Sequence, residues 1–156
     1  MIYQKRSAVS LSLILLCGCV GTNINVLEGY SYATDDKFTF EIVDRANVTS
    51  KGMSVFEAQL NERKNEIVID DSAPNRKVTI VFTNYYVRPG AARALVGVMA
   101  GTDNITSTTT ITAVPGGETL GEVQLVSKNP TATSSARSLI EQHANKIVDY
   151  IVSSGD

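Results

Sequence analysis

The sequence predicts one α+β domain, with a mixed and mostly antiparallel sheet of about five strands packed by a long C-terminal helix and one or two shorter helices. Three observations predict this class. Apolar residues alternate with polar ones over residues 38–42, which is the period of a strand with one buried face. Two strand-like segments, 104–114 and 119–128, are joined by a turn that contains proline and glycine. Apolar residues recur at helical spacing over 135–152.

After the first strand, a helix is expected near residues 54–64. Ser54 is followed three residues later by Glu57, which has the form of a capping box at a helix start. The next strands are expected at 67–69 and 77–86, with a turn between them. A strand, a helix and a strand in this order predict a right-handed crossover.

The segment 85–103 is the most distinctive part of the sequence because it is rich in Gly and Ala. Gly97 and Gly101 are four residues apart, a spacing that lets another backbone approach a helix closely. We favour a short helix near 91–99 that packs on the sheet of its own chain. The alternative is a contact surface for a partner, formed by Arg88, Arg93, Gly97 and Gly101.

The predicted hairpin over 104–128 has one apolar face. On its first strand Ile105 and Ile111 share a face, while threonines occupy most of the other. Threonine suits a half-buried pleat because its side chain is stiff and its hydroxyl tolerates water. On the second strand Val123 and Leu125 point to the same side. The hairpin should therefore bury one face and expose the other.

The last helix is expected to begin at a cap formed by Ser134 or Ser135. His143, the single histidine of the chain, lies on the apolar stripe of this helix and is expected to be a packed core residue. No second histidine supplies a metal set, and no serine-hydrolase elbow, phosphate loop or dinucleotide fingerprint occurs. We therefore expect no enzyme activity, no metal and no cofactor.

Residues 1–18 have the pattern of a secretory leader. Two basic residues precede an apolar run over 7–16, which is far shorter than the ~20 residues that a membrane-spanning helix needs. A leucine, Cys17 and the small Gly18 stand directly before Cys19. This order resembles the lipobox of bacterial lipoproteins, although Ala, Ser or Thr is commoner than Cys at the middle position. The plainer alternative is an ordinary leader with a chance cysteine.

The resemblance implies cleavage before Cys19, a diacylglyceryl thioether on its sulfur and a fatty acyl chain such as palmitate on its amine. Several chains are needed for stable anchoring, because one chain alone binds a membrane only marginally. Val20 rather than aspartate follows the cysteine, which in such proteins favours the outer membrane, here on its periplasmic face. We expect a lipidated tether over 19–37, with Tyr30 on the domain surface, and the folded domain over 38–153.

Charge and cysteine content exclude several classes of protein. The chain has 14 Lys and Arg residues against 16 Asp and Glu residues, and Lys5 and Arg6 leave with the leader. Because no basic block remains, we expect no nucleic-acid partner. The chain has 2 cysteines, Cys17 in the leader and Cys19 at the lipid site. The domain itself therefore has no disulfide and no thiol chemistry.

A second resemblance follows from the segment Tyr85 to Leu95, which contains Arg-Pro-Gly-Ala-Ala-Arg-Ala-Leu. With the long strand, glycine turn, returning strand and C-terminal helix that follow, this order is similar to a family of small bacterial lipoproteins known as domain of unknown function number forty-four ten. The similarity covers about residues 38–152. It implies the order of elements and an envelope location, and it brings no known activity.

The sequence thus predicts a non-enzymatic accessory module, held on the membrane through Cys19, that contacts another envelope protein or further copies of itself. One alternative is a binding module for a small ligand or glycan, with a pocket near Arg88 and Arg93. A hydrolase with an unusual site is the third and weakest hypothesis.

Overall fold

The computed structural model describes residues 21–63, 65–88, 101–130 and 135–153. It confirms the predicted α+β class, because these residues form six strands in one sheet and two helices. The elements in chain order are β1 (Gly21–Glu28), β2 (Lys37–Asp44), α1 (Ser50–Glu62), β3 (Val68–Ile69), β4 (Arg76–Tyr86), β5 (Asp103–Ala113), β6 (Thr119–Asn129) and α3 (Ala136–Val152).

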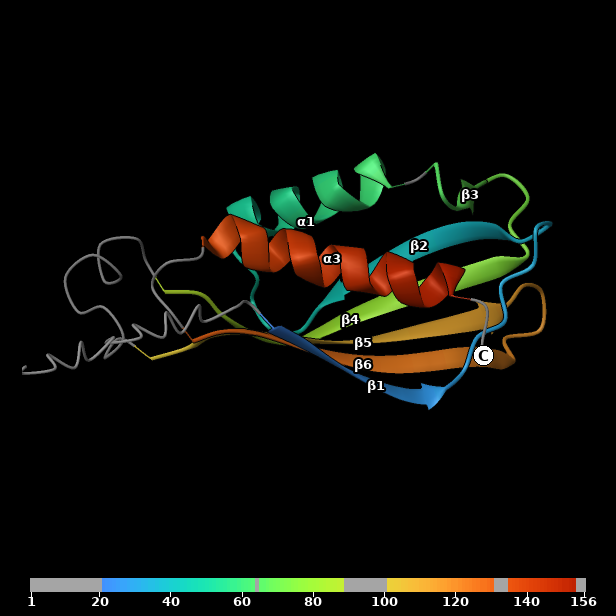
Figure 1. The fold of residues 1–156 in the computed structure, drawn as a ribbon. Helices are drawn as coiled ribbons and strands as arrows, with labels where there is room; N and C mark the ends of the chain where they lie inside the picture. The colour runs from blue at the N-terminus through green and yellow to red at the C-terminus, as the bar shows by residue number, and fades with distance from the viewer. Residues whose placement is uncertain (1–20, 64, 89–100, 131–134, 154–156) are drawn as a thin grey trace, which may run out of the picture.

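The sheet is mixed and mostly antiparallel, as predicted, with strand order β1-β6-β5-β4-β2-β3. The pairs β1–β6, β6–β5 and β5–β4 are antiparallel, while β4–β2 and β2–β3 are parallel. The parallel β2–β4 pair needs a crossover, and α1 supplies it. Figure 1 shows α1 and α3 side by side on the same face of the sheet, so both helices cover one side.

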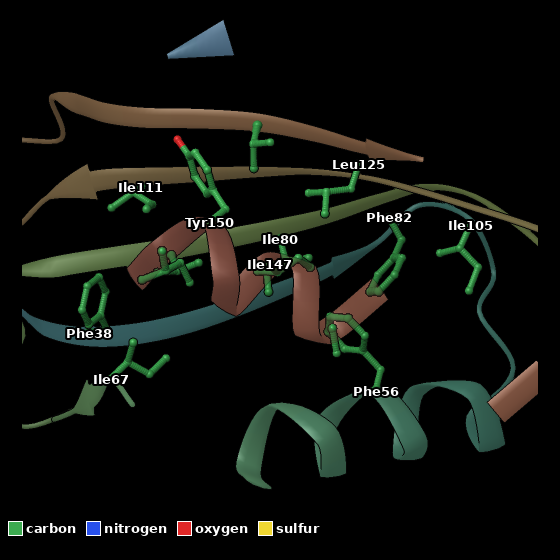
Figure 2. Close-up of a cluster of buried hydrophobic side chains, with 14 of the residues drawn as sticks. Phe38, Phe56, Ile67, Ile80, Phe82, Ile105, Ile111, Leu125, Ile147 and Tyr150 are labelled. Atoms are coloured by element: carbon green, nitrogen blue, oxygen red, sulfur yellow. The ribbon is translucent and has the colours of Figure 1, made fainter. Parts of the chain in front are cut away.

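The core lies between this helical layer and the sheet. Figure 2 shows Phe56 of α1 and Ile147 of α3 directed toward the strands. The rings of Phe56 and Phe82 meet edge to face, with centroids 4.9 Å apart. The hairpin has the predicted faces: alternate side chains of β5, including Ile105 and Ile111, are buried, and the threonines between them are partly exposed. The period-two pattern thus identified the buried face correctly.

The C-terminal helix has the predicted position. Ser135 is its N-cap, with the side-chain oxygen accepting a hydrogen bond from the backbone N–H of Ser138. Its buried residues include Leu139, His143 and Ile147, which form the expected stripe at helical spacing.

The start of α1 corrects the predicted cap. The helix begins at Ser50, because the Thr49 hydroxyl accepts the free N–H of Gly52 at 3.1 Å. Ser54 lies one turn inside, where its hydroxyl donates to the carbonyl oxygen of Ser50. The Ser54–Glu57 pair is therefore not the capping box that its spacing indicated.

The segment expected to be a tether also needs correction. Gly21–Glu28 is a strand that pairs with β6, with one irregularity between Val26 and Glu28, so the first part of the expected tether belongs to the sheet. Tyr30, expected on the surface, is buried against Phe38, and its hydroxyl donates to the buried carboxylate of Asp36. The physical reason is the open edge of β6, whose backbone groups need a partner strand.

Candidate functional site

Several predicted site residues lie outside the described part of the chain. These are Cys19 with the leader 1–18, and Arg93 and Gly97 of the possible contact surface, together with the expected helix at 91–99. Gly101 is described, is exposed and has a φ of 88°, with open space where a side chain would stand. Such a φ favours glycine at this position.

Arg88 corrects the expectation that it lies on a contact surface. It lies two residues after the end of β4 and is buried, where it meets the carboxylate of Asp103, the first residue of β5. Its Nε donates to Asp103 Oδ1 at 2.9 Å and its Nη2 to Oδ2 at 3.3 Å. Nη2 also donates to the carbonyl oxygen of Asn129 at 3.1 Å. Arg88 does bind an acidic group, but that group belongs to its own chain.

The Arg88–Asp103 pair closes the base of the segment 89–102. The backbone N–H of Arg88 donates to Asp103 Oδ1 at 2.9 Å, so one carboxylate binds both the backbone and the guanidinium of the same residue. Hydrogen bonding to this carboxylate raises the pKa of Arg88 and keeps it charged in the core. The two ends of the segment are therefore held together at a rigid position.

This position lies at the same end of the sheet as the start of β1. Asp103 pairs with Asn129, and the preceding residue of β6, Lys128, pairs with Gly21. Gly21 comes two residues after Cys19 in the sequence. The base of the distinctive segment and the first described residue after the predicted lipid site are thus neighbours across β6.

His143 is a core residue, as the sequence predicted. Its Nε2 lies 2.8 Å from the Ser107 hydroxyl and its Nδ1 lies 2.8 Å from the Ser127 hydroxyl. A neutral imidazole has one donor and one acceptor nitrogen, so it donates to one serine and accepts from the other. Burial lowers the pKa of His143 to about 4, which keeps the ring neutral at physiological pH.

The serine–histidine contact has the distance of a nucleophile and its base, but its surroundings do not fit such a role. Ser107, Ser127 and His143 all have no exposed surface. A general base must reach a substrate proton directly or through one water. This arrangement gives a substrate no access, so we assign the three side chains to a hydrogen-bonded core network.

The described residues contain no group of three His, Cys, Asp or Glu side chains placed to hold a metal ion. Within the same residues, no helix has both the length and the apolar character that crossing a membrane requires.

Two hollows flank α1. One, of about 210 Å³, lies between α1 and the β2–β3 edge, and is lined by Phe40, Ile42, Leu60, Ile67 and Ile69 with the acidic Glu57 and Asp71. The other, of about 340 Å³, lies between the starts of α1 and α3 and the end of β4, and is lined by residues that include Thr49, Val55, Tyr85, Arg88, Arg137 and Ile140. Both are open to solvent, and each joins apolar walls to charged side chains.

Exposed apolar surface is concentrated at the two edges of the sheet. Among the described residues, the exposed large hydrophobic side chains are Ile24, Val26, Leu27, Val68, Ile69 and Tyr86. All except Tyr86 belong to β1 or β3, the two edge strands. This surface was not predicted, because the residues of β1 were expected to form a tether. The alternation of Asn23, Ile24, Asn25 and Val26 was the signal that could have found it.

Comparison with solved structures identifies proteins with a similar fold. A dodecamer of a PelC point variant from Paraburkholderia phytofirmans, in space group C2, matches with a TM-score of 0.60 at 12% identity, over 84% of this chain and 97% of that chain. The PelC dodecamer from the same organism in space group P6 matches with a TM-score of 0.56 at 11% identity and the same coverage. The chain shares its fold with the PelC subunit.

A looser likeness joins the chain to the lipoprotein GNA1162 from Neisseria meningitidis, with a TM-score of 0.49 at 9% identity, over 76% of this chain and 99% of that chain. This value is too low to support an argument about function. No family model and no curated protein matches the sequence. The resemblance to domain of unknown function number forty-four ten therefore stays a prediction.

Proposed function

We propose that this chain is a non-enzymatic lipoprotein, anchored through Cys19 on the periplasmic face of the bacterial outer membrane, that acts as an accessory in an envelope assembly made from several copies of itself. The observation that carries the proposal is the apolar edge strand β1, which begins two residues after the predicted lipid site. Two resemblances support the anchor. The end of the leader is similar to a lipobox, and the chain is similar to the small lipoproteins of domain of unknown function number forty-four ten.

Self-association is favoured over a single foreign partner for two reasons. Large apolar side chains exposed in a row are unusual on a monomer and are typical of an interaction surface. Here they lie on two different edges of one sheet, so each molecule offers two sites. The PelC subunit, which has this fold, forms a dodecamer. That likeness supports an assembly of copies and does not fix their number.

The segment 89–102 is proposed as a second contact region. Its ends are held by Arg88 and Asp103 at the end of the sheet where β1 begins. A contact made through Arg93, Gly97 and Gly101 would therefore be near the anchor and the membrane. Gly97→Leu tests this role: loss of folding indicates tight internal packing, whereas a stable protein without its partner indicates an open contact surface.

The proposal is tested by crosslinking a tagged full-length chain in bacterial cells, followed by extraction in mild detergent and mass spectrometry. The Cys19→Ala variant is made in parallel and should leave the membrane fraction. We expect the tagged chain to crosslink mainly to other copies of itself, and the yield to fall when the anchor is lost. A different envelope protein recovered in equal amount would replace self-assembly with a hetero-complex. A monomer in intact cells would contradict the proposal.

A binding function for an anionic small molecule or glycan is the second candidate, supported by the hollow of about 340 Å³ that the cationic Lys51 and Arg137 help to line. A screen of envelope metabolites by thermal shift tests it. The ligand should raise the melting temperature of the unsubstituted chain and fail to raise that of an Arg137→Ala variant, because Arg137 lines this hollow. No shift with any anionic compound would contradict this candidate.

A further inference from the structure

We infer that copies of this chain join edge to edge, with β1 of one copy pairing antiparallel to the outer edge of β2 in the next, so that the sheet continues from one molecule to another. This inference rests on the self-association proposed above and names the surfaces that carry it. Four observations support it: the unpaired backbone, the apolar side chains, the charge pattern and the direction of the strands.

The first observation is that two stretches of backbone lack a strand neighbour. Among the strands that the structure describes, β1 is the last on its side of the sheet, and none of them pairs with its outer edge over Gly21–Glu28. On the opposite side, β3 pairs with β2 only at Lys37 and Phe38. Among the described residues, no strand pairs with the outer edge of β2 beyond Phe38. An exposed strand edge is a template for pairing with another chain.

The second observation is that apolar side chains stand on the same face at both edges. Ile24 and Val26 pair with Leu125 and Val123 of β6, whose side chains are buried under the helices, and therefore point to the helical face. They lie at the margin of that face and are exposed.

At the other edge of the sheet, Phe40 and Ile42 line the hollow of about 210 Å³ beneath α1. If β1 continues the sheet beside β2 along the rows of the sheet, Val26 of one copy comes opposite Ile42 of its neighbour, with Ile24 and Phe40 on the same face. The helical faces of the two copies then form one continuous apolar layer.

The third observation is the absence of protective charge on β1. Natural edge strands are commonly guarded by lysine, proline or bulges that prevent pairing. In β1 the only charged residue is Glu28, at its end, and the strand contains neither lysine nor proline. Its pairing with β6 is irregular between Val26 and Glu28. Six successive uncharged residues, Gly21 to Val26, precede this irregularity and present an edge that is suited to pairing.

The fourth observation is strand direction. Copies anchored in one membrane share the orientation of their lipid ends. β1 runs away from that end, because Gly21 follows Cys19 closely. β2 runs toward it, because its last residue, Asp44, lies on the same row of the sheet as Ile24, near the start of β1. This row passes through Phe82, Ser107 and Leu125. Adjacent β1 and β2 strands of neighbouring copies are therefore antiparallel. Because the two edges differ, the contact is head-to-tail, which generates a ring if it closes.

The inference is tested with cysteines on the solvent face, in full-length protein in bacterial membranes. Asn25 and Val43 lie on one row across the sheet, through Gln124, Thr108 and Val81. Copies with Asn25→Cys and copies with Val43→Cys are produced separately and together, then treated with a mild oxidant. Asn23→Cys and Glu41→Cys sample the neighbouring register. Thr110→Cys on β5 is the control, because it lies in the middle of the sheet.

We expect a disulfide-linked dimer when one copy has the β1 cysteine and the other has the β2 cysteine, because opposed residues of antiparallel strands lie within disulfide range. When either variant is produced alone, the amount of disulfide-linked dimer should stay at the level of the unsubstituted chain. A chain that has both cysteines should give a ladder of larger disulfide-linked species. A dimer from Asn25→Cys alone would overturn the inference in favour of symmetric β1–β1 pairing. If no pair crosslinks and the extracted protein is still oligomeric, the edges are not the interface. A monomeric extract would overturn both this inference and the proposed function.

Discussion

The Nε atom of Arg88 lies 2.9 Å from Oδ1 of Asp103, and neither side chain has any exposed surface. The two residues stand at the ends of the glycine- and alanine-rich segment that the sequence marks as distinctive. Removing one partner of a buried ion pair is costly, because it leaves the other charge buried without compensation. The pair therefore acts as a clasp for this segment and links β4, β5 and β6 at one end of the sheet.

The Arg88–Asp103 pair predicts that removing one of its two charges lowers the free energy of unfolding strongly. Asp103→Asn should lower the free energy of unfolding by about 3 kcal/mol, because the buried guanidinium loses its counter-charge. The matched control is Arg137→Ala, which removes an ion pair with Glu141 from a side chain that is 72% exposed. The control should cost less than about 1 kcal/mol. Urea unfolding of both variants measures the difference, and equal costs would refute the clasp.

The buried imidazole of His143 predicts a pH dependence of stability. Its pKa falls to about 4 in the folded chain, whereas an unfolded chain has the ordinary value near 6.5. Below pH 6.5 the unfolded state binds a proton that the folded state does not, so stability is lost as pH falls toward 4. Between pH 7 and pH 5 this one group should reduce the free energy of unfolding by about 2 kcal/mol.

Urea unfolding at the two pH values, with the unsubstituted chain and a His143→Gln variant, isolates this contribution. Glutamine is uncharged over the whole range and so removes the titration. The variant should lose about 2 kcal/mol less than the unsubstituted chain on acidification. An identical loss in both proteins would show that His143 is not responsible.

Gly121 predicts a third effect, through close packing. A Cβ atom at this position would lie 2.6 Å from the hydroxyl oxygen of Tyr150 and 2.7 Å from Cβ of Tyr30. Gly121→Ala should therefore destabilise the protein by about 1–3 kcal/mol, the usual cost of overpacking. Gly29→Ala is the control, because no atom lies within 4 Å of its added Cβ. Thermal unfolding compares the two, and a Gly121→Ala variant as stable as the control would contradict the packing described.

The fold could be predicted from the sequence where the hydrophobic period is strong. The alternation around Ile105 and Ile111 identified β5 and its buried face, and the helical stripe placed His143 in the core. These patterns succeed because burial on one face directly selects which residues are apolar.

Other features depend on partners that are distant in the sequence. β1 has asparagine at alternate positions, which is depleted in strands, and its pairing is decided by the open edge of β6. Arg88 and Asp103 meet only because β4 and β5 end and begin at the same side of the sheet.

The start of α1, in contrast, is set by local contacts: Asp44 accepts the N–H groups of Ala46 and Val48 and turns the chain into the Thr49 cap.

The most direct test of the central claim is the mass of the detergent-extracted, full-length chain with and without Val26→Lys, measured by light scattering. Val26 on β1 is 53% exposed, and Tyr86 is 51% exposed at the end of β4, which is neither of the two edge strands. Tyr86→Lys is therefore a matched control for placing a lysine at an exposed apolar position. The account predicts a large assembly for the unsubstituted chain and for Tyr86→Lys, and a folded monomer for Val26→Lys. An assembly that is unchanged by Val26→Lys would contradict the account.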